Sequence, residues 1–341
     1  MGYDNLRLEK GMYRQGGMSF TQVLESLDPS ENYRGTALEG TDAFQRQLKR
    51  FGIRAKGAGS SPVEKFFATM DSAVLFPEYI ARTVRQGMEE NDILPAIVAT
   101  TTVIDAMDYR SIYSTADDAD MELRDVVEGS EIPTTEVKTK EHLVSLTKRG
   151  RMLVASYEAL RFQKLDLFSV MLRQIGAHIQ KQQMADAVSV LLAGDGNSNP
   201  AAVYNVGTSP ISGTKGRIGY DQLVEFWGQF DPYTMNTILC STATMTDIMK
   251  IPELQNPMAG LNFQGTGKVG TPLGANLLRS SAVADGTIIG LDNRYALELV
   301  RAGDVLVEYD KLIDRQLERA AITSISGFGK ICADASKVLN V

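Results

Sequence analysis

The longest regular pattern of apolar positions lies in residues 163–193, directly before Gly194. Apolar side chains recur there at spacings of three and four, which places them on one face of an α-helix. These positions are Leu165, Phe168, Leu172, Ile175 and Ile179. Glycine after the last position is a common helix end. Such a helix spans about 45 Å at 1.5 Å per residue, whether it is a core helix, a contact surface or both.

The segment before this helix, residues 109–149, is long, polar and strand-like. A turn near Gly129 predicts a hairpin whose two arms each reach about 50 Å, because a strand rises ~3.3 Å per residue. A compact chain of this length has a radius of gyration of only about 20 Å. Hairpin and helix therefore predict a subunit that contacts copies of itself; a solvated surface hairpin is the alternative.

Charge is distributed unevenly over this hairpin. The outgoing half is acidic and the return half is more basic, so the two could pair within one hairpin or between neighbouring copies. The acidic side chains are Asp117, Asp118, Asp120, Glu122, Asp125, Glu128 and Glu131, interrupted by Arg124. The basic side chains are Lys138, Lys140, Lys148 and Arg149.

Residues 1–61 are polar and contain too few large apolar side chains for a core of their own. They predict an arm that lies across another part of the protein, or a disordered tail. Ser19 and Gln22 have capping-box spacing. Further helices are expected to begin at residues 61–64 and 76–78, and residues 93–104 resemble a strand.

The second half of the chain mixes short helices and strands without a regular βαβ repeat, which favours an α+β fold. Residues 256–274 are rich in Gly, Pro and Asn and predict an exposed loop. Helices are expected at residues 220–230 and 242–250. Strands are expected at residues 235–240, 276–280, 287–291, 296–300, 305–309 and within 313–338.

Composition narrows the function classes. The net charge of −7 argues against a dedicated nucleic-acid reader, which usually carries a basic face. The two cysteines, Cys240 and Cys332, are too few for a disulfide framework and fit synthesis in a reducing compartment. Since no apolar run approaches 18 residues, no membrane span is expected.

Candidate chemistry is sparse. Residues 265–270 match G-x-G-x-x-G, but no apolar strand precedes them and Pro272 follows where a helix should begin. Asp118, Asp120 and Glu122 resemble part of a calcium loop that lacks its glycine and distal glutamate. His142 and His178 are both expected to be exposed and lack partners at metal spacing; Cys240 is expected to be an inert core thiol, and Trp227 a core or interface anchor. We therefore expect no enzyme and no cofactor.

The order of these parts resembles the HK97-fold major capsid proteins of tailed double-stranded DNA bacteriophages. Several stretches are similar to that family's elements. They are Glu128-Gly129 with Ile132-Pro133 for the E-loop tip, residues 146–160 for the return into the P-domain, residues 191–196 with Pro200 for the end of the spine helix, residues 236–239 with Leu273-Gly274 for the A-domain core, and residues 285–292 and 327–329 for the closing strands.

The resemblance implies a domain order with specific boundaries. These are an N-terminal arm at residues 1–61, a first P-domain part at 62–108, the E-loop at 109–149, the P-domain with its spine helix at 150–217, the A-domain at 218–300 and closing P-domain strands at 301–341. Some family members cross-link an E-loop lysine to an asparagine of a neighbouring P-domain. Lys138 or Lys140 could take the place of that lysine, but neither the asparagine nor the acidic residue is matched in this sequence, so the cross-link is not carried over to this chain.

The resemblance also implies a function: a structural subunit that forms hexamers and pentamers of an icosahedral shell around double-stranded DNA. Inter-subunit contacts are expected at Asp117, Asp118, Asp120, Glu122, Arg124, Asp125, Glu128, Lys138 and Lys140, and a loop at the capsomer centre is expected at Asn262, Gly265 and Lys268. Portal, scaffolding and decoration proteins are the implied partners, without sequence-specific DNA binding or a membrane. A chain that keeps Met1 suggests a separate scaffold or none. The protein would be made in the bacterial cytoplasm and end in the virion.

Two other functions fit the same features. The fold also occurs in encapsulins, so a nanocompartment shell that loads protein cargo is the alternative; the long N-terminal arm favours a phage shell. An oligomeric enzyme of unrecognised type is the third hypothesis.

Overall fold

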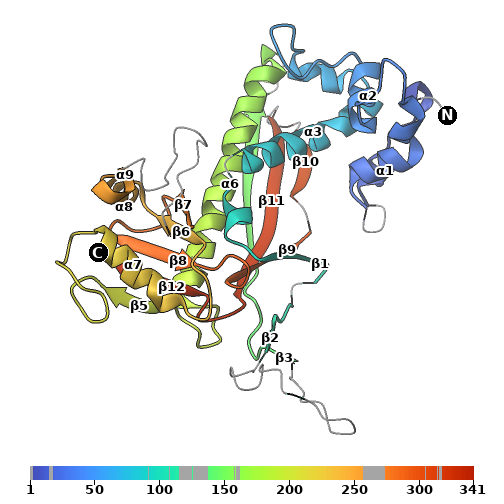
Figure 1. Cartoon of the computed structure of the whole chain (residues 1–341). Helices are drawn as coiled ribbons and strands as arrows, with labels where there is room; N and C mark the ends of the chain where they lie inside the picture. Colours follow the sequence, from blue (N-terminus) through green and yellow to red (C-terminus); the bar gives the residue numbers. More distant parts are fainter. Residues whose placement is uncertain are drawn as a thin grey trace. The chain divides into compact units, whose positions relative to one another are not determined.

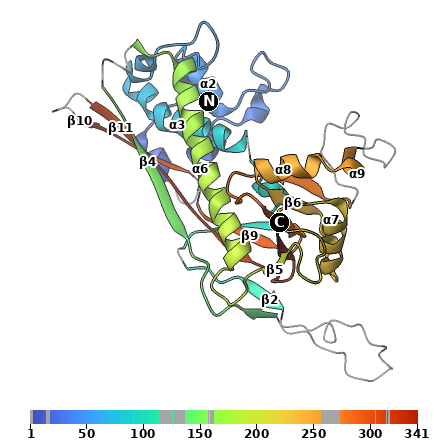
Figure 2. The same ribbon diagram turned by 90° about the vertical axis from the view of Figure 1, so that its left-hand side faces the viewer.

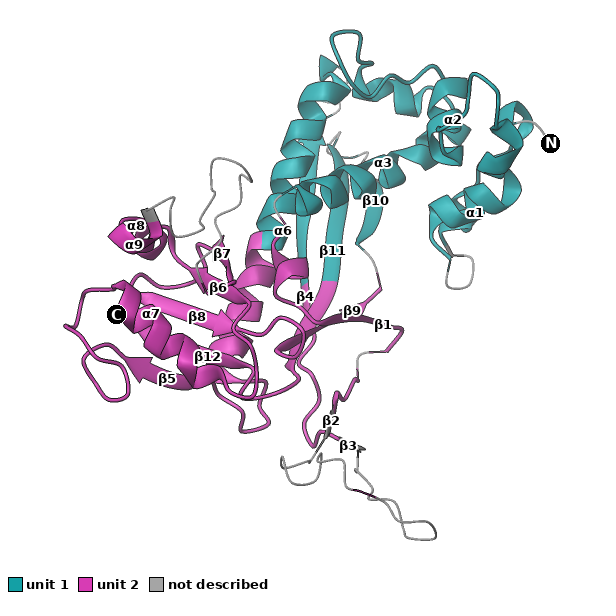
Figure 3. Cartoon of the chain, in the orientation of Figure 1, with its two compact units in different colours: residues 1–91, 149–180, 305–324 teal, residues 92–148, 181–304, 325–341 magenta. Residues whose placement is uncertain are grey.

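The computed structural model describes residues 3–14, 18–90, 92–106, 108–114, 125, 137–156, 158, 162–255, 273–303, 305–312, 314 and 317–341. The chain forms two compact units, each assembled from three separate stretches (Figure 3). Unit 1 consists of Met1–Asn91, Arg149–Gln180 and Val305–Ser324; unit 2 consists of Asp92–Lys148, Lys181–Asp304 and Ile325–Val341. Helix α6 and strand β11 have residues in both units, so the units are not consecutive domains.

Unit 1 combines helices from the N-terminal region with three strands from later parts of the chain (Figures 1 and 2). Strand β10 pairs antiparallel with β11, and β4 also pairs with β11. The helices are α1 (Phe20–Leu27), α2 (Ala43–Arg50), α3 (Met70–Glu89) and the first part of α6 (Leu165–Ala193), with short 3-10 turns at Tyr3–Asn5, Lys10–Arg14, Ser30–Tyr33 and Val63–Phe67; the strands are β4 (Thr147–Ser156), β10 (Leu306–Leu312) and β11 (Leu317–Lys330).

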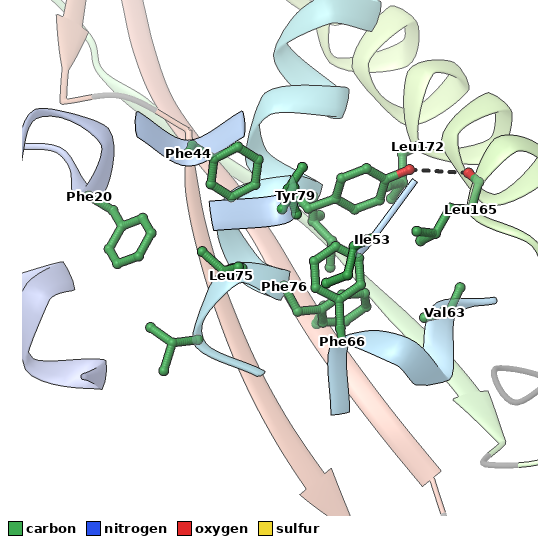
Figure 4. Packing of buried hydrophobic residues seen from close by; sticks show 14 of the residues in the cluster. Phe20, Phe44, Ile53, Val63, Phe66, Leu75, Phe76, Tyr79, Leu165 and Leu172 are labelled. Atoms are coloured by element: carbon green, nitrogen blue, oxygen red, sulfur yellow. Dashed lines mark hydrogen bonds between the residues drawn. The ribbon is translucent and has the colours of Figure 1, made fainter. Parts of the chain in front are cut away.

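One apolar core joins these elements. Figure 4 shows Phe66, Phe76 and Tyr79 packed together, with the Tyr79 hydroxyl donating to the Leu165 carbonyl oxygen at 3.1 Å. The close approach of α3 and α6 requires two glycines: a Cβ on Gly87 or Gly176 would overlap backbone atoms of the opposite helix. Apolar side chains of β4, β10 and β11 pack against the same core.

The N-terminal segment belongs to this core instead of forming a separate body. Leu6, Phe20, Leu24 and Phe44 are buried in it beside α3. This explains how a segment too poor in apolar residues for its own core is still ordered: it shares the core of α3.

A tyrosine of this segment completes α3. The Tyr13 hydroxyl donates to the Val74 carbonyl oxygen at 2.8 Å and accepts from the Glu78 amide at 3.0 Å. The hydroxyl thus lies between the Val74 carbonyl and the Glu78 amide, which would hydrogen-bond to each other in a regular helix. Pro77 is next to this interruption. Burial is the main cause that raises the pKa of Tyr13, so the hydroxyl stays protonated.

Unit 2 contains two sheets and the hairpin base. In one sheet, β1 (Thr100–Ile104) pairs parallel with β9 (Leu297–Ala302), which pairs antiparallel with the last part of β11. The second sheet has the order β5-β12-β8-β6-β7, with parallel pairs at both edges. Its strands are β5 (Ala202–Asn205), β6 (Thr237–Cys240), β7 (Asn276–Arg279), β8 (Thr287–Leu291) and β12 (Ser336–Asn340).

Helices cover the second sheet of unit 2. They are α7 (Tyr220–Trp227), α8 (Thr242–Met249) and α9 (Pro252–Gln255), with a 3-10 turn at Gly228–Phe230. Gly290 in β8 is required here, since a Cβ would lie 2.8 Å from atoms of Met235, Phe226 and Phe230. The C-terminal strand β12 pairs antiparallel with β8 in the same sheet.

Most predicted elements are confirmed, including α6 with 29 residues, the capping box at Ser19 and the order of the later strands. Three local predictions were wrong. The helix expected to begin at residues 61–64 is a 3-10 turn at Val63–Phe67 without a side-chain cap, and the Ser61 hydroxyl accepts from the Arg54 amide instead. Pro77 lies inside α3, which begins at a Thr69 capping box. Of residues 93–104, only Thr100–Ile104 form a strand, after a 3-10 turn at Leu94–Ala96.

Within the part of the chain that the structure describes, no helix has both the length and the apolar character needed to cross a membrane.

Candidate functional site at the base of the hairpin

The base of the predicted hairpin is present in unit 2. Strand β2 (Ile112–Ser114) pairs antiparallel with β3 (Val137–Thr139), with Ile112 opposite Thr139. Just below, the Lys140 amide donates to the Ser111 carbonyl oxygen at 2.9 Å and the Val144 amide to that of Tyr109 at 2.8 Å. The two arms are therefore paired along the whole base.

The outgoing arm is fixed by a buried glutamate. Glu298 lies in β9 and only 4% of its surface is exposed. Its carboxyl group accepts hydrogen bonds from the hydroxyls of Thr102 (2.6 Å), Tyr109 (2.7 Å) and Ser111 (2.6 Å). Desolvation and the bond to Glu298 raise the pKa of Tyr109, so that its proton stays in place for this bond. Glu298 thus holds one residue of β1 and two residues of the outgoing arm in place.

The return arm is fixed by a buried ion pair. The Lys140 Nζ lies 3.0 Å from Asp195 Oδ2, and their side chains are 6% and 2% exposed. The same ammonium donates to the Lys330 carbonyl oxygen, and the Lys330 amide donates to Asp195 Oδ2 at 2.9 Å. The return arm, the end of α6 and the end of β11 therefore meet at a single carboxylate.

The turn after α6 positions that carboxylate. Gly194 has a φ of +85°, which turns the chain away from the helix and brings Asn199 Oδ1 to the Asp195 amide at 3.1 Å. Asn197 donates to Asp195 Oδ1 from its backbone and side-chain nitrogens. Although desolvation alone would raise the pKa of Asp195, the bonds from Asn197, Lys330 and Lys140 outweigh it and lower the pKa to about 2.

Two glycines of β11 allow the return arm to lie close over this strand. A Cβ on Gly327 would overlap the Ser145 carbonyl oxygen, and one on Gly329 would lie 3.3 Å from Val144. The base is thus held by buried charges, backbone bonds and direct backbone packing. Such an arrangement fixes the base of the hairpin at β2 and β3.

Two further ionisable groups of unit 2, those of Lys330 and Cys240, are buried. Burial lowers the pKa of Lys330 to about 8, but its side chain is fully buried and Nζ faces the Leu191 carbonyl oxygen. Burial raises the pKa of Cys240 to about 12, consistent with an inert thiol. His142 and His178 are both exposed, as expected. The described residues contain no group of three or more His, Cys, Asp or Glu that could hold a metal.

Most residues predicted for inter-subunit contact lie outside the described residues. This holds for Asp117, Asp118, Asp120, Glu122, Arg124 and Glu128, and for Asn262, Gly265 and Lys268 of the expected capsomer-centre loop. Asp125 is described and exposed. Lys138 is placed in β3 by its backbone.

Lys140 needs a correction. We expected its side chain at the surface for a contact with a neighbour, but it is buried against Asp195 within unit 2. Trp227 also differs from a core anchor, since 44% of its surface is exposed.

Sequence reasoning missed Glu298, Asp195 and Lys330. A usable signal existed for each, because a charged residue interrupts an apolar strand (Glu298), lies between two glycines at a helix end (Asp195) or ends an apolar β11 stretch (Lys330). Fully buried charges are rare unless they are paired.

Comparison with known proteins agrees with this architecture. A family model described as phage capsid protein matches residues 139–328, more than half of the chain, from β3 through α6 to β11. A search of curated proteins finds no match.

Solved structures show the same fold at low sequence identity. The capsid of a native GTA particle has a TM-score of 0.53 and 14% identity, covering 76% of this chain and 90% of that chain. A virus-like particle from Pyrococcus furiosus has a TM-score of 0.52 and 11% identity, covering 77% and 98%. The structure described as Microbacterium phage Oxtober96 has a TM-score of 0.50 and 10% identity, covering 73% of this chain and 90% of that chain.

These structures are assembled particles, and the architecture they share with this chain is the α+β HK97-like capsid fold. The chain belongs to the phage capsid protein family and is a capsid shell protein of phage-like particles.

Proposed function

We propose that this protein is the major capsid subunit of a tailed bacteriophage, assembling as hexamers and pentamers into an icosahedral shell around double-stranded DNA. The observation that supports this most directly is the rigid base of the hairpin. Two buried carboxyl groups, of Glu298 and Asp195, hold the two ends of the segment at Tyr109, Ser111 and Lys140. A long polar and charged sequence that begins and ends at a fixed base fits contact with a neighbouring copy.

In this proposal the acidic residues 117–128 contact an adjacent subunit, and the loop around Asn262, Gly265 and Lys268 lies at the capsomer centre. The net charge of −7 fits DNA that is enclosed with few direct contacts. A portal and a scaffolding protein would be further partners, and decoration proteins could be added to the finished shell. The subunit acts as a structural protein and not as an enzyme.

The test replaces residues 115–136 by a short Gly-Ser turn, which keeps β2, β3 and the anchored base. We expect a folded subunit that no longer forms closed shells, whereas the unaltered chain forms them. Hydrogen exchange at the Lys140 and Val144 amides checks that the base is intact. Shells of normal size from the shortened chain, seen by electron microscopy, would contradict the proposal.

The contents of the particles distinguish the nanocompartment alternative. Particles isolated from a producing host should contain double-stranded DNA. A single co-purified protein species without DNA would favour a cargo-loading shell instead.

A further inference from the structure

Cationic side chains gather beside the beginning of α6 in unit 1. Residues 49–65 and 164–166 together carry six basic and two acidic side chains, in a chain whose net charge is −7. We call four of these basic residues, Arg54, Lys56, Lys65 and Lys164, the basic surface. Lys65 is half-buried and the other three are exposed. Positive charge is therefore concentrated in one part of an acidic chain.

Backbone hydrogen bonds fix the loop that carries this charge. The Val63 amide donates to the Gln163 carbonyl oxygen at 2.9 Å, next to the first residue of α6. The Leu165 amide donates to the Ser61 carbonyl oxygen at the same distance. The Ser61 amide donates to the Arg54 carbonyl oxygen at 2.8 Å, and the Ser61 hydroxyl accepts from the Arg54 amide at 3.0 Å. The loop from Arg54 to Ser61 is thus closed and held against the start of α6.

Lys65 and Lys164 reach back to this loop from outside it. The Lys65 Nζ donates to the Gly52 carbonyl oxygen at 2.6 Å, and the Lys164 Nζ donates to that of Ala58 at 3.4 Å. Gly52 and Ala58 lie on either side of the other two members of the basic surface along the chain. The fold therefore gathers all four cationic groups around one short loop.

The charge of the basic surface is not neutralised within unit 1. In the part of this unit that the structure describes, no ion pair joins any of the four groups to a carboxylate. A buried arginine of the same unit differs, because Arg46 is paired with Asp28 at 2.7 Å. The carboxylate of Asp166 lies next to the loop, but its Oδ1 accepts from the Gly57 amide at 3.2 Å. Like charges held together in this way attract an anionic partner.

We propose that the basic surface contacts the phosphates of double-stranded DNA enclosed by the shell. This inference rests on the proposed shell function, because it takes the packaged DNA as the ligand. Double-stranded DNA carries one negative charge per about 1.7 Å of its axis, and lysine and arginine are the side chains that neutralise it. Such contacts read no sequence. Because the chain as a whole is acidic, they are confined to a small part of it.

The number of contacts determines how strongly salt weakens the binding. Each neutralised phosphate contributes about −0.9 to the slope of log K against log salt, so four contacts give a slope of about −3.6. The affinity should then fall about 150-fold between 50 and 200 mM salt. Arg54→Gln with Lys56→Gln leaves two contacts, which should reduce the slope to about −1.8 and the fall in affinity to about twelvefold.

Fluorescence anisotropy of a short labelled DNA duplex, titrated with the dissociated full-length subunit, measures this slope. Two duplexes of unrelated sequence should bind alike. Lys215→Gln with Arg217→Gln is the matched control, because it removes the same charge from an exposed loop of unit 2 and should keep the slope of the unaltered chain. Equal slopes for the two variants would overturn the inference. Binding of poly-glutamate without binding of the duplex would also overturn it and assign the surface to an acidic protein.

Lysine acetylation tests the same contact inside the particle. Lys56 and Lys164 should react several times more slowly in DNA-filled particles than in particles emptied of DNA, whereas Lys215 should react equally in both. Equal reactivity of Lys56 and Lys164 in the two kinds of particle would overturn the inference and leave the shell function standing. Particles that never contain DNA would contradict the proposed function itself, and the inference would fall with it.

Discussion

Replacing Asp195 by alanine tests the anchoring of the hairpin most directly. In the folded chain this carboxylate accepts hydrogen bonds from the Lys140 ammonium, the Lys330 amide and Asn197. Asp195→Ala removes all of them and leaves the buried Lys140 ammonium with the Lys330 carbonyl oxygen. We expect a loss of free energy of unfolding together with a loosened hairpin base.

The burial of the Lys140–Asp195 pair determines how much free energy of unfolding is lost. Breaking a buried ion pair by removing one partner costs about 3–5 kcal/mol, because the remaining charge stays out of water. With side chains only 6% and 2% exposed, the Lys140–Asp195 pair meets that condition. Since a folded protein is stable by only about 5–15 kcal/mol, the loss is a large share of the total. Asp195→Asn keeps one acceptor oxygen and should lose less.

Urea denaturation of the dissociated subunit measures this loss, and hydrogen exchange at the Lys140 and Val144 amides reports on the base itself. Asp247→Ala is the control: the Asp247–Lys250 pair has side chains 61% and 69% exposed and should contribute about 0–1 kcal/mol. A loss below about 1 kcal/mol for Asp195→Ala, with unchanged exchange, would refute our account of the base.

The carboxylate of Asp195 also predicts how the stability of the folded chain depends on pH. The pKa of Asp195 falls from 3.8 to about 2 on folding, so its stabilisation is fully present above pH 4 and is lost as the pH falls toward 2. The shift corresponds to about 2 kcal/mol. In urea titrations between pH 5 and pH 2, the difference in stability between the unaltered chain and Asp195→Ala should therefore narrow by about that amount. A constant difference over this range would contradict the assignment.

Two further substitutions test other parts of the fold. Tyr13→Phe removes the hydroxyl that bridges two backbone groups of α3 and should cost about 1–3 kcal/mol in urea denaturation, because both groups lose their partner; an unchanged midpoint would show that the helix closes without it. Gly327→Ala places a Cβ into the Ser145 backbone and should cost about 1–3 kcal/mol. Gly11→Ala, which has open space around it, serves as the control and should unfold at nearly the native midpoint.

The parts of the fold that follow from local periodicity could be predicted from the sequence. The spacing of Leu165, Phe168 and Leu172 predicts α6, and β-branched runs with turn residues predict the strands around β8. The start of α3 could not be predicted in the same way. The sequence near Pro77 resembles a helix start, yet Tyr13, more than sixty positions away, supplies the bonds that let the helix continue through it.

The position of the site along the chain could be predicted from the sequence, but the residues that anchor it could not. The hairpin and its base are visible in the charge pattern, whereas the anchors Glu298 and Asp195 are known only once distant strands are paired. Lys140 illustrates the difference: it belongs to a polar run, and only the tertiary fold shows that its charge is turned inward.

The interrupted layout of the two units has a consequence for how such a gene can change. The chain passes from one unit to the other within α6 and within β11. A recombination event with a single crossover therefore cannot bring in a complete unit from a relative, and a break inside either element would join helix or strand halves that never packed together. Substitutions within one unit are then expected to be matched by substitutions in distant stretches of the gene, and exchange is expected to succeed mainly for the whole coding sequence.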